Sequence, residues 1–306
     1  MLPLRRLHKR SQLLQGVRAF FLSRGYLEVD TPIRLATPLP ESHIRSFPSG
    51  DRYLHSSPEQ CMKRLLAAGA KQLFQVCHCF RMEEKGRYHE TEFTMLEWYR
   101  VGWSYRELMD ECETFVRELA AAVEGLEGVE DGTALVREGR KISLAPPWPR
   151  VTVDEVFRGH AGMGAAEAVE RELFDELLVT RIEPRLGWER PVFLCDYPAA
   201  LGSLARKKPG DATVVERFEL YAAGIELANG FSELTDPDEQ RRRFQAEMEK
   251  GERTGNPFPA MPERFLADLG RLGDTAGVAL GLDRLFMILF GCDTVAGAMC
   301  MPPEEA

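Results

Sequence analysis

Apolar residues recur at helical spacing in several stretches of the chain. In the first stretch, residues 4–24, the apolar positions are Leu7, Leu13, Leu14, Val17, Phe20 and Phe21. This spacing places them on one face of a helix, which Gly25 ends. The same reasoning predicts further helices over residues 104–125, 165–186, 236–254 and 262–272.

Another helix is predicted from its start signal. Ser57 can cap a helix, Pro58 suits the first helical position, and Gln60 completes a capping box. This helix is expected to end near Gly69.

Strand-like stretches lie between these helices, at residues 72–80, 93–101, 193–197 and 277–281. Residues 218–227 predict a hairpin around Ala222-Ala223, followed by an Asn229-Gly230 turn. Helices and strands alternate irregularly, and the strands cluster in hairpins. This order favours an α+β fold, an antiparallel sheet with helices packed on it, over a doubly wound parallel sheet.

Composition and charge narrow the function classes. The 306 residues include 39 Lys+Arg and 48 Asp+Glu, a net charge of −9, which argues against a bulk electrostatic hold on nucleic acid. No run of 18 uncharged apolar residues exists, so no membrane span is expected. Seven irregularly spaced cysteines without a signal peptide indicate free thiols in a reducing cytosol, and hence a cytoplasmic protein.

The first candidate site is the polar connection at residues 80–93, between two predicted strands. Arg81 and Glu83 have the same strand parity, so they are expected to share a face. On the second strand, a face that carries Glu97 and Tyr99 is not a core pattern and suggests the floor of a polar pocket. An exposed hairpin with surface ion pairs explains the pattern equally well.

Two further segments suggest phosphate chemistry. A hairpin loop at Ala222-Ala223 would place Glu219 directly opposite Glu226, and such a carboxylate pair suits Mg²⁺ on a nucleotide. Alternatively, one of the two carboxylates points to solvent or pairs with an arginine. Without other evidence, two carboxylates in a hairpin favour this second explanation over a metal site. Residues 277–284 form a strand-to-helix junction in which Gly281 allows close backbone approach and Arg284 can bind phosphate.

Cys77-His78-Cys79 suggests zinc at first sight. The segment lacks the usual two-residue spacer and a second pair of ligands, so it favours a buried strand instead.

Together, three segments resemble the signature motifs of class II aminoacyl-tRNA synthetases: residues 24–32, residues 80–100 and residues 277–290. The stretches EFTMLEWY and IELANGFSEL resemble the lysyl-tRNA synthetase branch. MKRLLAAG, GRYH and GVALGLDR are similar to the stand-alone paralogues that attach lysine or (R)-β-lysine to elongation factor P. The resemblance implies the class II catalytic core, a six- or seven-stranded antiparallel sheet flanked by helices, as a homodimer.

The resemblance also implies the domain organisation. One catalytic domain is expected over residues 1–306, with residues 126–190 as a possible insertion or linker region. The first motif begins near residue 20, which leaves no room for the N-terminal OB-fold anticodon-binding domain of lysyl-tRNA synthetases. Binding of tRNA is therefore not expected.

Residue roles follow from the resemblance, position by position. It assigns the α-phosphate to Arg81, the γ-phosphate to His89 and Arg284, and Mg²⁺ to Glu219 and Glu226. It implies an ATP site made of Arg81, Glu83, His89, Phe93, Glu226, Leu227, Gly281 and Arg284. Of these, Arg81 and Arg284 are the expected catalytic groups.

The implied substrate site holds an amino acid with two ammonium groups. Its residues are Ser57, Pro58, Glu59, Glu97, Tyr99, Asn229, Glu233 and Ala279. Glu59 would bind the ammonium near the carboxylate, and Glu233 with Glu97 the distal one, so these carboxylates are expected at opposite ends of the pocket. A substrate without the distal ammonium would leave carboxylates unpaired.

Two positions depart from the family pattern. Glu90-Thr91 stands where the family usually has Asn-Pro, which puts a contact from residue 90 to ATP in doubt. Ala279 stands where lysyl-tRNA synthetases usually have glycine, and its methyl group could favour an amino group on the β carbon.

The expected activity is ATP-dependent formation of a lysyl- or (R)-β-lysyl-adenylate, with Mg²⁺, and transfer to a lysine side chain of elongation factor P. Two alternatives remain open: a truncated lysyl-tRNA synthetase-like enzyme that charges tRNA or another acceptor, and a non-catalytic paralogue that senses an amino acid. The second is disfavoured because Arg81 and Arg284 are both present.

Overall fold

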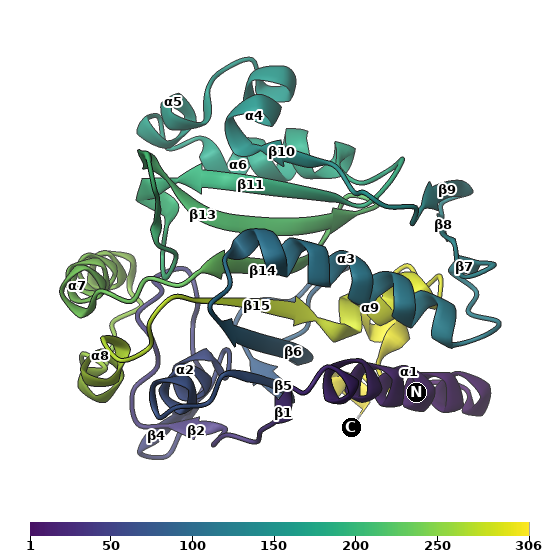
Figure 1. Ribbon diagram of the computed structural model, residues 1–306, viewed down its shortest axis with the longest axis horizontal. Coiled ribbons are helices and arrows are strands. Elements are labelled where there is room, and N and C mark those ends of the chain that lie inside the picture. The colour runs from purple at the N-terminus through teal and green to yellow at the C-terminus, as the bar shows by residue number, and fades with distance from the viewer. Residues whose placement is uncertain (306) are drawn as a thin grey trace.

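The computed structural model describes residues 1–305, in which a nine-stranded sheet forms the centre (Figure 1). The strand order is β1-β5-β6-β15-β14-β13-β11-β10, with β12 paired to β13. Pairs from β5 to β11 are antiparallel, and only the outermost pairs, β1 with β5 and β10 with β11, are parallel among the described residues. The predicted α+β fold is confirmed, and the sheet is larger than the six or seven strands expected.

The central sheet consists of β1 (Leu27–Glu28), β5 (Gln72–Phe80), β6 (Glu92–Val101), β10 (Arg150–Thr152), β11 (Val192–Pro198), β12 (Lys207–Lys208), β13 (Asp211–Ala222), β14 (Ile225–Ser232) and β15 (Thr275–Gly281). Two small sheets consist of β2 (Arg34–Leu35), β4 (Arg52–Leu54) and β3 (Pro48–Ser49), and of β7 (Val129–Glu130), β8 (Ala134–Arg137) and β9 (Arg140–Ser143). The α-helices are α1 (Leu4–Ser23), α2 (Glu59–Ala67), α3 (Tyr105–Ala122), α4 (Val153–Ala161), α5 (Ala165–Glu170), α6 (Phe174–Leu177), α7 (Pro237–Thr254), α8 (Glu263–Leu269) and α9 (Leu282–Leu289).

Strand alternation gives the sheet one apolar and one polar face. Phe74 on β5 and Trp98 on β6 are fully buried in a core shared with α1, α3 and α9. Figure 1 shows α3 lying across the middle strands on this side. Because successive side chains of a strand point to opposite faces, Glu97 and Tyr99 project to the other side of the sheet. That second face carries the candidate site.

The β13–β14 hairpin differs from its predicted register. The loop is Ala223-Gly224, with φ angles of 54° and 73°, one residue later than expected. Glu226 therefore pairs with Tyr221, and Glu219 pairs with Asn229 beyond an irregularity in the ladder. The prediction that Glu219 lies directly opposite Glu226 is wrong.

The predicted Asn229-Gly230 turn is also wrong, because both residues lie inside β14. Gly230 is packed between strands: an added Cβ would lie 2.7 Å from the Phe218 ring and 2.8 Å from Val278. This glycine serves close strand packing and not a change of chain direction.

Residues 126–190 contain regular structure. Residues 129–143 form the β7-β8-β9 sheet, and residues 153–182 pack a core of their own against β11 and β13, at the edge of the central sheet seen at the top of Figure 1. The single helix predicted over 165–186 is interrupted, first at Glu172, whose φ is 58°, and again before Pro184, which has no N–H to continue a helix.

Within residues 1–305, no helix has both the length and the apolar character that crossing a membrane requires.

Candidate active site

Two adjoining cavities open on the polar face of the sheet. The first is lined by Arg81, Glu84, His89, Phe93, Glu226, Leu227, Asn229, Ala279, Gly281 and Arg284, among others. The second is lined by Ser57, Glu59, Arg81, Glu97, Tyr99, Glu219, Glu226, Asn229, Ala279 and Arg284, among others. Arg81, Arg284, Glu84 and Glu226, among others, line both, so the two spaces meet at two arginines and two carboxylates.

Arg81 follows the last residue of β5 and projects into the shared space. Its guanidinium carbon lies 5.3 Å from the centroid of the Phe93 ring. Its nearest acceptors are the Ser56 carbonyl oxygen, at 3.4 Å from Nε, and Glu84 Oε2, at 3.6 Å from Nη1. These contacts are long for an arginine, so most of its donors remain available to an anion.

Arg284 lies in the first turn of α9. Its Nε donates to the Tyr88 carbonyl oxygen at 3.1 Å, and its Nη1 donates to Glu226 Oε2 at 3.0 Å. The preceding residue, Asp283, is 2% exposed and accepts from Arg10 at 2.7 Å and from the Thr94 N–H at 2.6 Å. This buried network fixes the start of α9 beside β6 and so fixes Arg284 in the wall of the cavities that Arg81 also lines.

Glu83 does not take the position expected of it. Its φ is 70°, and its side chain is 65% exposed and accepts from Arg45 Nη1 at 2.5 Å. The strand parity that paired Glu83 with Arg81 ends with β5 at Phe80, so the argument fails at residue 83. Glu84, which sequence reasoning missed, is the carboxylate of this segment that lines both cavities.

Glu219 is held by three donors on the floor of the second cavity. Tyr197 and Tyr221 donate their hydroxyls to Oε2 at 2.5 and 2.7 Å, and Arg217 Nη2 donates to Oε1 at 2.7 Å. Burial raises the pKa of Glu219 despite Arg217, and the nearby Glu226 adds to this increase. Each carboxylate of the predicted pair therefore forms an ion pair with an arginine, Glu219 with Arg217 and Glu226 with Arg284, as one of the alternatives to a metal site had proposed for one of them.

These carboxylates still fit a divalent cation. Glu226 is one-third exposed and lies on the same sheet face as Glu219, and a third carboxylate, Glu183, accepts from Tyr221 at 3.1 Å. Mg²⁺ prefers a few carboxylate oxygens together with phosphates and water. Sequence reasoning missed Glu183 because it lies outside the recognised motifs.

Glu183 gives the protein a testable pH dependence. Burial, with the charges of Glu226 and Glu219, raises the pKa of Glu183 to about 7 from 4.5. The folded state therefore holds a proton that the unfolded chain releases, and stability falls as the pH rises from about 4.5 to 7. Denaturant unfolding at several pH values in this range measures the effect. The unfolding free energy of Glu183→Gln should fall less with rising pH than that of the wild type, whereas the exposed control Glu189→Gln should behave like the wild type. If the unfolding free energies of Glu183→Gln and the wild type change in parallel with pH, Glu183 does not have the raised pKa.

The far end of the second cavity is strongly acidic. Glu97 is 1% exposed and accepts from Ser57 Oγ at 2.5 Å and from the Tyr99 hydroxyl at 2.9 Å. Burial, reinforced by the charge of Glu59, raises the pKa of Glu97 well above its usual value. Ser57 Oγ also accepts from the Glu59 N–H at 3.0 Å, whereas buried Gln60 Oε1 has no hydrogen-bond partner among residues 1–305, so the predicted capping box does not form.

Glu59 and Glu233 share one internal cation. Lys63, one turn along α2 from Glu59, is 2% exposed, and its Nζ contacts a carboxylate oxygen of each. Burial alone would lower the pKa of Lys63, but the two carboxylates raise it, whereas burial raises the pKa of Glu233 to about 8. The prediction that Glu59 and Glu233 lie at opposite ends of the pocket is therefore wrong, because both carboxylates contact the same lysine.

Close backbone approach shapes this end of the cavity. A Cβ on Gly277 would lie 2.1 Å from the Tyr99 ring and 2.6 Å from Glu233 Oε1, so only glycine fits there. Asn229, Ala279 and Glu97 lie side by side across β14, β15 and β6. Pro58 precedes α2, and neither Pro58 nor Glu233 lines either cavity.

Comparison with known proteins agrees with this architecture. Residues 4–305 match the family described as tRNA synthetases class II (D, K and N). Proteins named elongation factor P--(R)-beta-lysine ligase from Hamiltonella defensa subsp. Acyrthosiphon pisum (strain 5AT) and from Vibrio atlanticus (strain LGP32) are 37% and 36% identical. These alignments cover 99% and 98% of this chain and 97% and 96% of the relatives. A protein of the same name from Proteus mirabilis (strain HI4320) is 37% identical, over 97% of this chain and 95% of its own. The chain therefore belongs to the class II tRNA synthetase family and, within it, to the group of elongation factor P--(R)-beta-lysine ligases.

Proposed function

We propose that this protein activates lysine or (R)-β-lysine with ATP and transfers the aminoacyl group to a lysine side chain of elongation factor P. The observation that carries the proposal is the meeting of two cavities at Arg81 and Arg284, one suited to a nucleotide and the other acidic. The names of the relatives support elongation factor P as the acceptor and (R)-β-lysine as the amino acid.

The nucleotide would occupy the first cavity. Phe93 offers a ring face for a base, and Arg81 and Arg284 approach the phosphates from two sides. Glu226 and Glu219, with Glu183 nearby, would hold Mg²⁺, which would neutralise phosphate charge. His89 lines both cavities together with Arg284. Burial, reinforced by the charge of Arg284, lowers the pKa of His89, so a neutral imidazole is favoured there.

The amino acid would occupy the second cavity, with its carboxylate toward Arg81. Carboxylate oxygen attacks the α-phosphorus, and the bond to pyrophosphate breaks. The acceptor amine, once deprotonated, then attacks the acyl carbon, and AMP leaves. No side chain forms a covalent bond, so the protein contributes positioning and electrostatic stabilisation.

The acidic end of the second cavity explains the choice of a diamino acid. Glu59 and Glu97 line this end, and Glu59 shares the one buried cation, Lys63, with Glu233, which does not itself line the cavity. Two substrate ammonium groups balance the remaining charge, whereas an apolar amino acid leaves it buried and unpaired. The Ala279 methyl group, in register with Asn229 and Glu97, narrows the floor where an amino group on the α or β carbon would lie.

Two further properties belong to the same proposal. Exposed apolar side chains at Leu4, Leu22 and Leu27, on α1 and on the edge strand β1, support a homodimer formed through this side of the protein. Because the proposed acceptor is a translation factor, we place the reaction in the cytoplasm.

The mass of purified elongation factor P tests the proposal directly. After incubation with this protein, ATP and Mg²⁺, we expect a gain of one lysyl residue, with a preference between lysine and (R)-β-lysine that Ala279→Gly alters. Charging of tRNA without any mass change on elongation factor P would favour a tRNA-charging enzyme instead. Failure to exchange pyrophosphate with either isomer would favour an amino-acid sensor.

A further inference from the structure

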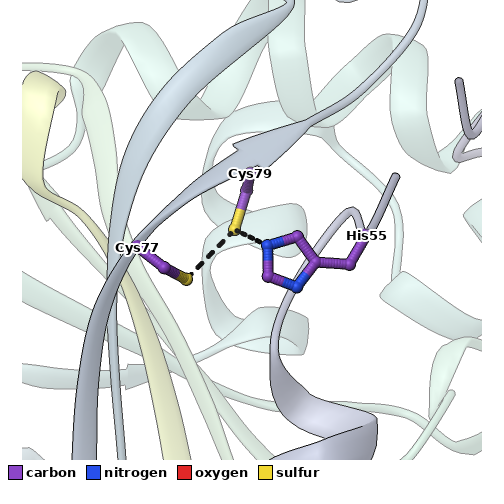
Figure 2. Close-up of side chains that lie close together, drawn as sticks. All are labelled: His55, Cys77 and Cys79. Carbon is purple, nitrogen blue, oxygen red and sulfur yellow. Dashed lines mark hydrogen bonds between the residues drawn. The ribbon is translucent and has the colours of Figure 1, made fainter. Parts of the chain in front are cut away.

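A separate cluster of reactive side chains lies on β5, beyond the two cavities. Cys77 and Cys79 project from this strand toward His55, which follows β4 (Figure 2). One ligand atom from each of the three lies within 4.8 Å of the others. The two sulfurs are 3.9 Å apart, and Cys79 Sγ lies 4.0 Å from His55 Nε2.

Backbone geometry explains why these three residues meet. Residues two apart in a strand share a face, so Cys77 and Cys79 point together, whereas His78 points away and contacts Glu92. The Phe80 N–H donates to the His55 carbonyl oxygen at 3.0 Å, which holds His55 against the strand. The sequence motif lacked a third ligand because that ligand comes from a different part of the chain.

The spacing fits a metal better than a disulfide. Tetrahedral zinc with bonds of about 2.3 Å to sulfur and 2.0 Å to nitrogen requires S···S of ~3.8 Å and S···N of ~3.5 Å. The observed 3.9 and 4.0 Å need only small movements. A disulfide needs sulfurs ~2 Å apart, and its Cα atoms would span ~6.6–6.8 Å along an extended strand, the upper limit of disulfide geometry. Forming it would require distortion of β5 where it pairs with β6.

The surroundings are those of a soft-metal site. His55 is 1% and Cys79 0% exposed, and Met95 Sδ lies 3.9 Å from Cys79 Sγ. His55 Nε2 now donates to the His78 carbonyl oxygen at 2.7 Å, and buried Nδ1 has no partner among residues 1–305. Metal binding at Nε2 therefore requires that the hydrogen bond to the His78 carbonyl oxygen is given up and that the ring proton moves to Nδ1.

We infer that His55, Cys77 and Cys79 form a binding site for a thiophilic d10 metal ion, zinc(II) or copper(I). Two thiolates and one imidazole supply three ligands of suitable softness. The thioether sulfur of Met95, a residue that also lines the first cavity, lies next to Cys79 Sγ and is a candidate fourth ligand. The site thus adjoins the nucleotide cavity without sharing any of the residues assigned to the reaction.

Metal titration of the reduced, metal-free full-length protein tests the inference. Zn²⁺ competed against a chromophoric chelator, and Cu⁺ competed anaerobically against a copper(I) chelator, should each reveal one tight equivalent. We expect Cys77→Ser and Cys79→Ser to lose at least tenfold in affinity, and Cys61→Ser, a half-buried cysteine elsewhere on α2, to match the wild type. Met95→Leu should weaken copper(I) alone if the thioether is a ligand.

Cobalt(II) gives a second measurement on the unaltered protein, in case a variant fails to fold. Binding at this site should produce a thiolate-to-cobalt charge-transfer band, and added zinc should remove it. No band and no chelator competition would overturn the inference. So would equal metal binding by Cys77→Ser and the wild type, or a Cys77–Cys79 disulfide that forms in air while zinc fails to bind.

Discussion

Replacing Arg81 by alanine should lower lysine-dependent pyrophosphate exchange by about 10²–10³-fold, or ~3–4 kcal/mol of transition-state stabilisation. Arg81 faces both cavities and has no close ion pair, with Glu84 at 3.6 Å, so its charge is available to the developing charge on the α-phosphate. Because a planar guanidinium can bind two oxygens at once, Arg81→Lys should recover only part of the activity.

The matched control is Arg87→Ala, in the same connection between β5 and β6. Arg87 is 51% exposed and interacts with Asp293 near the surface, so its loss should leave exchange within a few-fold of the wild type. Equal losses for Arg81→Ala and Arg87→Ala would point to general damage of the connection. Full activity of the Arg81→Ala variant would remove the basis of the proposed mechanism.

Lys63→Met should destabilise the protein by about 3–5 kcal/mol and abolish lysine-dependent exchange. The substitution leaves Glu59 and Glu233 side by side and buried without a counter-charge. Since burial already raises the pKa of Glu233 to about 8, loss of Lys63 should raise it further, and the deficit should be larger above this pH than below it. Denaturant unfolding at both pH values measures this difference.

Arg64→Met provides the control from the next position of α2. Arg64 pairs with Asp268 at 2.6 Å but is 40% exposed, so its loss should cost less than ~1 kcal/mol. Adding Glu233→Gln to Lys63→Met should restore part of the stability, because one uncompensated charge disappears. If the double variant is no more stable than the Lys63→Met variant, the three side chains do not act as one charged unit.

Local pattern predicted the main strands well. Residues 72–80 and 93–101 correspond to β5 and to nearly all of β6, since apolar alternation and flanking polar segments mark both. The interruption of that alternation at Glu97 and Tyr99 correctly indicated a polar pocket floor. The exposed-hairpin alternative fails for these two side chains, which are 1% and 3% exposed, but it describes the tip of the connection, where Glu83 and Lys85 form surface ion pairs.

What the sequence could not predict depends on backbone detail and long-range placement. Ala223 and Glu83 both have positive φ, which an L residue with a side chain rarely adopts, so neither the hairpin register nor the direction of Glu83 could be foreseen. Lys63 looks like any solvent-facing lysine of a helix in the sequence, because Glu233, which follows β14 and is far from it in the chain, contacts it only in the folded protein. His55 likewise could not be recognised as a candidate metal ligand from the sequence, because only the fold brings it next to Cys77 and Cys79.

The Arg10–Asp283 contact joins residues 273 positions apart in the chain. Arg10 also donates to the Ala298 carbonyl oxygen at 2.8 Å, 288 positions away, so α1 is anchored to two segments that are distant from it in the sequence. Contacts this distant in sequence form late, because most of the chain must first be ordered around them. Because Arg284 directly follows Asp283, its position in the cavity depends on this late contact, and the phosphate-binding geometry is complete only after α1 has docked against the start of α9.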